Sequence, residues 1–417
     1  MIELSTLLVM TVLLFIAFVF SVSNKNFMNP LMFFLGPLTV SYYLFYFIFR
    51  PVNAVSALTI GTFMAATIIF TLSFLISVMF NRSLALKHGN MQKVSYVKSN
   101  RILIYAGILF GLISFVYAIF YFKNLGTSST YGNSVREVYI DTIDSTPFII
   151  KYGKYFLLFG TATLWYEYLN EVKKLNKYFI YLLLGCSLAN SFLTLSRTDL
   201  MITIIPFAII FAKSQKKKSL NIGIKKIYNK MKTLLLVVAS MVLIFLIGSL
   251  RSMSGAATSL LSPNNYITQY IGYPLVAFDK WISHRPWEGN GVQAIEPLNK
   301  VFSVLGIGPQ NHLVFAQRGQ FNVYGFLKEP YLDFGVLGIV MYMIIVGFFC
   351  GWIYMKSLQK NEYYIIFYSF YMYAAFMAFF SWSFFMITYV YLIVYLVAIS
   401  SVDTSIETTK KGSGIIG

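Results

Sequence analysis

The sequence predicts an all-α polytopic membrane protein with about eleven transmembrane helices, within a range of ten to twelve. Of its 417 residues, 58% are hydrophobic and only 12% are charged, whereas a soluble domain carries about 25% charged residues. Apolar runs long enough to cross about 30 Å of hydrocarbon recur along nearly the whole chain. These runs are continuous rather than alternating, which favours spanning helices over the strands of a barrel.

The apolar runs define the helices in order. We expect spans near residues 3–22, 30–49, 54–80, 102–122, 148–169, 178–195, 199–213, 233–250, 331–354, 363–381 and 384–401. The pair 178–195 and 199–213 is too long for one crossing, so we expect a hairpin that turns at residues 196–199. The resulting regions are N-terminal transmembrane helices (1–250), a periplasmic loop domain (251–330), C-terminal transmembrane helices (331–401) and a cytoplasmic tail (402–417).

The net charge of +18 is explained by topology. In a soluble protein such a charge would suggest nucleic acid as a partner, but here most basic residues lie in short loops, so we expect none. The basic loops 81–101, 170–177 and 213–232 are predicted to be cytoplasmic. The N-terminus then lies outside, as do the loop 123–147 and the large loop region between the helix ending near 250 and the helix starting near 331.

Arg197 lies between the apolar runs 178–195 and 200–212. An arginine at membrane depth is costly, so a partner or a function must stabilise it there. Ser196 can cap the following helix, and Asp199 completes a capping box. Because a helix N-terminus attracts anions and a guanidinium forms a fork suited to phosphate, we interpret Arg197 as an anion-binding residue. The alternatives are a snorkelling interfacial arginine or an Arg197–Asp199 pair.

Further arginines are expected on the same outer side. Arg251 ends the span 233–250. It is either a second anion-binding residue or a cation placed favourably at a helix C-terminus. Two guanidiniums that meet could chelate a pyrophosphate. Arg136 and Arg318 are candidate substrate-binding residues, with ordinary loop positions as the alternative.

The block Phe321–Gly335 leads into the span 331–354 and places Asp333 just inside its outer end. Asp333 is a candidate base or acceptor for a sugar hydroxyl, although a carboxylate near a helix N-terminus is favourable without any function. His312 in the outer loop is a second candidate base. Asn322, Tyr324 and Tyr331 are candidate sugar contacts or residues of an interfacial aromatic belt. The sequence contains no HExxH motif and no CxxC pair, so we expect neither a metal nor a cofactor.

These features together resemble a known family. They comprise the Ser-Arg-Thr turn, the arginine that closes a later span, and a long outer loop. That loop contains Tyr270-Ile271-Gly272-Tyr273-Pro274-Leu275 and Phe278-Asp279 and ends in Phe-Asn-Val-Tyr and Tyr-Leu-Asp-Phe-Gly. The chain resembles the O-antigen polymerases, the Wzy-type polymerases of oligosaccharide repeat units. The hydropathy layout is similar over most of the chain, and the motifs cover residues 190–350.

The resemblance implies a metal-independent glycosyltransferase of lipopolysaccharide or related surface polysaccharide biosynthesis. Its substrate would be an undecaprenyl-pyrophosphate-linked oligosaccharide, presented at the periplasmic face of the bacterial inner membrane. Its expected partners are membrane lipids and a chain-length regulator of the polysaccharide co-polymerase type. Arg197 and Arg251 would hold the pyrophosphate. Tyr270 and Tyr273 would help to form a sugar-stacking surface with Trp281 and Trp287.

Three alternatives remain open. An O-antigen ligase would transfer the same donor to the lipid A core. A flippase for lipid-linked oligosaccharides, or another transporter, should carry buried charges through its spans and show repeat symmetry. Because the predicted spans are nearly charge-free and the arginines lie on one side, the sequence favours an enzyme over a transporter. A purely structural membrane anchor is the third alternative.

Overall fold

A computed structural model describes residues 2–87, 100–126, 147–170, 172, 175–193, 197–214, 266–284, 293–304, 323–359 and 361–400. These residues form helices without β-strands, apart from an isolated bridge between Gly325 and Ser381. The helices are α1 (Ile2–Ser23), α2 (Pro30–Leu44), the π-helix η1 (Phe45–Phe49), α3 (Ala57–Lys87), α4 (Arg101–Gly126), α6 (Phe148–Leu169), α7 (Lys177–Leu193), α8 (Arg197–Ser214), α10 (Tyr266–Gly272), α11 (Pro274–His284), α12 (Glu296–Val304), α13 (Lys328–Leu358), α14 (Glu362–Met377) and α15 (Ile387–Ser400).

Five of these helices are long and apolar enough to cross a membrane: Ile2–Ser23, Pro30–Phe49, Ala57–Leu84, Arg101–Tyr121 and Lys328–Leu358. The prediction of a mostly helical protein with apolar helices long enough to span a membrane is therefore confirmed. The count of about eleven spans stays a prediction. The predicted span 233–250 and the tail 402–417 lie outside the described residues.

Local sequence explains where several helices start and end. Asn29 caps α2 by accepting a hydrogen bond from the Met32 backbone N–H at 3.1 Å, and Pro30 follows at the first helical position. Asn361 caps α14 in the same way, with the Tyr363 N–H at 3.0 Å. The predicted span 384–401 starts too early, because α15 begins at Ile387, whose N–H donates to Glu296 Oε2 at 3.1 Å.

Helices α3 and α13 pack closely through small residues. A Cβ atom at Gly347 would lie 2.6 Å from the Phe70 carbonyl oxygen, and one at Gly351 would lie 2.6 Å from Ser77 Cβ. Ser77 Oγ also donates to the Phe348 carbonyl at 2.7 Å. Glycines four residues apart allow two backbones to approach at this distance, as the Gly347-x-x-x-Gly351 spacing indicates.

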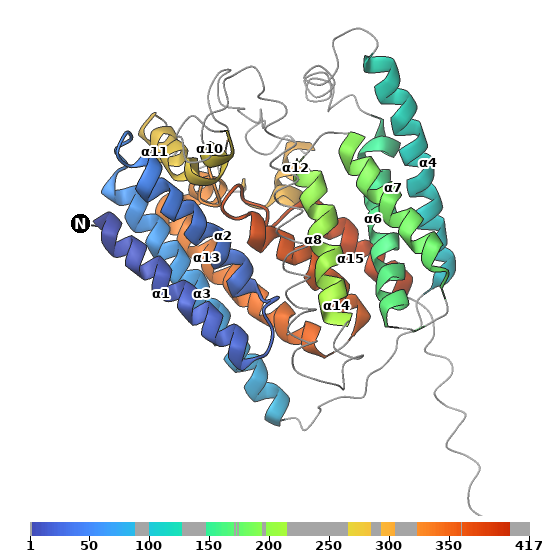
Figure 1. Cartoon of the computed structure of the whole chain (residues 1–417), viewed down its shortest axis with the longest axis horizontal. Coiled ribbons are helices and arrows are strands. Elements are labelled where there is room, and N and C mark those ends of the chain that lie inside the picture. Colours follow the sequence, from blue (N-terminus) through green and yellow to red (C-terminus); the bar gives the residue numbers. More distant parts are fainter. Residues whose placement is uncertain are drawn as a thin grey trace, which may run out of the picture.

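The helices form a bundle with short helices at one end (Figure 1). Helices α1, α2, α3 and α13 lie on one side, α4, α6 and α7 on the other, and α8, α14 and α15 between them. Helices α10, α11 and α12 lie at the end where α8 and α13 begin, which is called the α10–α12 end below. The predicted loop domain 251–330 thus contributes helices to this end.

Candidate functional site

The first turn of α8 carries the Ser-Arg-Thr-Asp motif. Helix α8 begins at Arg197, so the predicted helix start beside this residue is confirmed, and Asp199 lies in its first turn. Ser196 and the side chain of Arg197 lie outside the described residues. The backbone therefore places Arg197 at the N-terminal end of α8, where free N–H groups favour anions.

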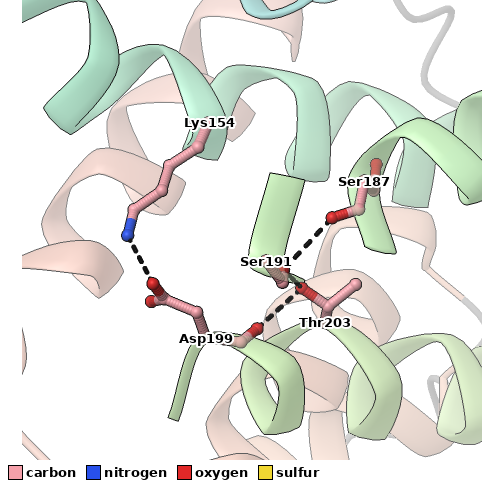
Figure 2. A network of polar contacts seen from close by, with 5 residues as sticks. All are labelled: Lys154, Ser187, Ser191, Asp199 and Thr203. Carbon is pink, nitrogen blue, oxygen red and sulfur yellow. Dashed lines mark hydrogen bonds and ion pairs between the residues drawn. The ribbon is translucent and has the colours of Figure 1, made fainter. Parts of the chain in front are cut away.

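Asp199 forms an ion pair with Lys154 of α6. Lys154 Nζ lies 2.8 Å from Asp199 Oδ2, and each side chain is only 17% exposed (Figure 2). Lys154 Nζ also lies 5.2 Å from the centre of the Tyr155 ring. Two charges in so shielded a place attract each other strongly, because little water screens them. The pair joins α6 to the first turn of α8.

Hydroxyl groups hold the same turn against α7. Ser191 Oγ and Thr203 Oγ1 are 2.8 Å apart, and Thr203 Oγ1 donates to the Asp199 carbonyl oxygen at 2.8 Å (Figure 2). Ser191 Oγ donates in turn to the Ser187 carbonyl at 3.1 Å. All three hydroxyl side chains are buried. Contacts from α6 and α7 thus determine the position of the α8 N-terminus.

Lys154 was missed by sequence reasoning, which treated residues 148–169 as part of a nearly charge-free set of spans. Helix α6 in fact carries Lys151, Lys154 and Glu167. A long apolar stretch can retain such charges when each has a partner. The spacing of Lys151 and Lys154, three residues apart on one helix face, was the signal available in the sequence.

Asp333 is fully buried and binds backbone groups near α12. Its carboxylate accepts hydrogen bonds from the Gln293 N–H, from the Ala294 N–H at 3.0 Å and from the Tyr342 hydroxyl at 2.7 Å. Trp382 Nε1 donates to the Ala294 carbonyl at 2.7 Å from the other side. Both oxygens of Asp333 are engaged in holding the segment before α12. Its role as a base stays a prediction.

The structure brings several predicted sugar-binding aromatics together. The ring centre of Trp281 in α11 lies 6.1 Å from that of Tyr324 and 6.3 Å from that of Tyr331. Lys328 Nζ lies 4.4 Å from the centre of the Tyr324 ring. The ring centre of Phe278 lies 5.8 Å from that of Tyr331. The four rings of Phe278, Trp281, Tyr324 and Tyr331 are called the aromatic cluster. It joins α11 to the start of α13 at the α10–α12 end.

Two further predicted aromatics, Tyr270 and Tyr273, have different neighbours. Tyr270 stacks on Phe380, with ring centres 5.8 Å apart. The Tyr273 hydroxyl accepts a hydrogen bond from Lys280 Nζ at 2.9 Å. Neither contact is with a member of the aromatic cluster.

The remaining predicted site residues are Arg136, Arg251, Trp287, His312, Arg318 and Asn322, and all of them lie outside the described residues. The convergence of Arg197 and Arg251 therefore stays a prediction. Within the described part of the chain, no group of three or more His, Cys, Asp or Glu residues could hold a metal ion.

Comparison of the chain with protein-family models, curated proteins and solved structures finds no match. Its activity must therefore be inferred from its own residues and their geometry.

Proposed function

We propose that this protein is a metal-independent glycosyltransferase that polymerises undecaprenyl-pyrophosphate-linked oligosaccharide repeat units into O-antigen or a related surface polysaccharide. The reaction takes place at the periplasmic face of the bacterial inner membrane. The observation that carries the proposal is the shielded Lys154–Asp199 pair beside the first residue of α8, where Arg197 lies.

The electrostatics of this turn suit a pyrophosphate leaving group. Lys154 and Arg197 supply two positive charges against the single negative charge of Asp199. The N–H groups of the α8 N-terminus add a further partial positive charge. Preorganised positive groups stabilise the negative charge that develops as the leaving group departs, and Arg251 is the proposed second guanidinium.

The reaction balances without a cofactor. The acceptor hydroxyl oxygen forms a bond to the anomeric carbon of the donor chain, and the bond from that carbon to the pyrophosphate oxygen breaks. The lipid pyrophosphate leaves with the bonding electron pair, while the hydroxyl proton passes to a base. The three hydrogen bonds that Asp333 accepts favour a positioning role, so His312 is the preferred candidate base.

The aromatic cluster is the proposed sugar-binding surface. Indole and phenol rings offer flat apolar faces together with a polar edge, a combination that suits sugar rings. Lys328, above the Tyr324 ring, adds a donor at the same place. Membrane lipids and a chain-length regulator complete the proposed set of partners.

A transporter is the second candidate function, and the charges inside the helices favour it. Lys154 and Asp199 lie within α6 and α8, and Arg101 pairs with the buried Glu167 at 3.2 Å. Charges inside spans often line ion or substrate pathways. The O-antigen ligase also remains an alternative, since it would use the same donor chemistry.

The test is complementation of a gene deletion in the native host, with the surface polysaccharide separated on a gel. Arg197→Ala and Arg197→Lys should both leave a single repeat unit on the core, because lysine keeps the charge but loses the guanidinium fork. The control is Lys177→Ala, which changes an exposed cation at the start of α7. Immunoblotting should show equal amounts of each variant in the membrane.

The same gel separates the alternatives. Free polymer that is not attached to core would indicate a ligase, and the loss of even a single repeat unit would indicate a transporter. Near-normal polymer from both Arg197→Ala and Arg251→Ala would overturn the proposed pyrophosphate clamp.

A further inference from the structure

A second group of charged side chains lies at the end of the bundle opposite the α10–α12 end. It involves the start of α4, the end of α6, the start of α14 and the end of α15. Arg101 Nη2 lies 3.2 Å from Glu167 Oε2, and the Glu167 side chain is 2% exposed. Glu362 is the first residue of α14, and Tyr395 belongs to α15. None of these residues belongs to the site proposed above.

Several polar atoms of this group are buried without a hydrogen-bond partner among the described residues. They are Glu362 Oε1, Arg101 Nε and the hydroxyl oxygens of Tyr363 and Tyr395. A buried carboxylate oxygen without a donor is costly when the group is ionised and much less so when it carries a proton. The protonated carboxyl of Glu362 is itself a hydrogen-bond donor.

The neighbouring charges favour the neutral form of Glu362. Burial, together with the negative charge of Glu167, raises the pKa of Glu362 to about 8. Arg101 of α4 is bound to Glu167, whose carboxylate keeps its negative charge paired there.

The cations of the adjoining helices have other contacts. Lys213 of α8 donates to Ser357 Oγ at 2.5 Å and lies 3.9 Å from the centre of the Tyr368 ring. Lys356 of α13 lies over the Tyr364 ring at 5.8 Å. Tyr395 is the titratable group that faces Glu362 from α15.

We propose that Glu362 is a proton-binding site of the folded protein, occupied at neutral pH and emptied at alkaline pH. Emptying it leaves a negative charge on a carboxyl group with a buried, unpartnered oxygen and weakens the packing of α14 against α6 and α15. The site lies far from the proposed glycosyl-transfer chemistry and does not depend on it. Its ligand is a proton, taken from the side of the membrane where α4 and α14 begin.

Thermal unfolding of the full chain in detergent tests the proposal across a pH series. A group whose pKa is higher in the folded than in the unfolded state stabilises the fold at low pH, and this stability is lost as pH rises through the folded pKa. The unfolding temperature should therefore fall between about pH 5 and pH 8 and then level off. Glu362→Gln, which mimics the neutral acid, should remove this fall and unfold at a higher temperature at alkaline pH. Glu3→Gln, in the surface pair with Arg50, should keep it.

Infrared spectroscopy supplies a second measurement that does not require Glu362→Gln to fold. The wild type should show a protonated carboxyl band at neutral pH that disappears at alkaline pH. Glu167→Gln should shift this loss to lower pH, because it removes the neighbouring negative charge. A wild type without such a band, or a Glu362→Gln variant with the wild-type pH dependence, would overturn the proposal.

Discussion

At the residue scale, Lys154 and Asp199 stabilise each other. Each side chain is 17% exposed, and the two charged atoms are 2.8 Å apart. Removing one partner of a shielded ion pair leaves the other charge poorly compensated, whereas removing both partners leaves no uncompensated charge. The same logic applies to Asp333, whose buried carboxylate is acceptable because three donors surround it.

The pair predicts a non-additive effect on stability. Lys154→Met alone or Asp199→Leu alone should each lower the free energy of unfolding by about 1–3 kcal/mol, the cost of a buried polar group that loses its partner. The double variant should lose less than the sum of the two. Unfolding of purified protein in mixed micelles measures this double-mutant cycle. Additive losses would contradict a direct interaction.

At the element scale, α13 combines a local break in its helical backbone with a close packing contact to α3. Its backbone leaves helical geometry at Phe334 and Gly335, and Gly335 has φ +63° and ψ −145°, a conformation almost restricted to glycine. This break directly follows Asp333, so the carboxylate is directed to the Gln293 and Ala294 N–H groups. Further along, Gly347 and Gly351 contact α3. One helix thus connects the α10–α12 end with the interior of the bundle.

The close α3–α13 contact predicts that a glycine-to-alanine substitution has different effects on stability at two helical glycines. Gly351→Ala should lower stability by about 1–3 kcal/mol, because its Cβ would lie 2.6 Å from Ser77 Cβ and 2.7 Å from the Phe74 carbonyl oxygen. Gly185→Ala in α7 is the control, since nothing lies within 4 Å of its added Cβ. It should be neutral or slightly stabilising, because alanine favours helix. Equal unfolding temperatures for the two variants would contradict the close α3–α13 contact.

At the scale of the whole molecule, the helix directions suggest a topology. Helices α3 and α8 end opposite the α10–α12 end, and a basic stretch follows each of them in the sequence. Basic loops stay on the cytoplasmic side, so the α10–α12 end is predicted to be periplasmic. Both the first turn of α8 and the aromatic cluster lie at this end.

Cysteine labelling tests this topology. After Cys186 and Cys350 are replaced by alanine, a membrane-impermeant maleimide should label Ser283→Cys in intact spheroplasts, because Ser283 is exposed on α11. Arg82→Cys, on the exposed end of α3, should react only after permeabilisation. The reverse pattern would place the proposed site in the cytoplasm.

The helical elements were largely predictable, because hydropathy is a property of contiguous residues. The apolar ranges 3–22, 30–49 and 102–122 correspond closely to α1, to α2 with η1, and to α4. The start of α8 beside Arg197 was predictable from Ser196 and Asp199, since capping is local. The start of α15 was not, because its first N–H is bound by Glu296, 91 residues earlier in the chain.

The sequence by itself determined the helical membrane class, the apolar segments and the presence of an arginine at a helix start. Only the tertiary structure decided that Asp199 pairs with Lys154, that Asp333 holds the segment before α12, and that Trp281 meets Tyr324 and Tyr331. The physical reason is the separation along the chain between the groups that interact. Burial of apolar surface and helix capping act along a few turns of chain, whereas charges and rings find partners that only packing brings within a few ångströms.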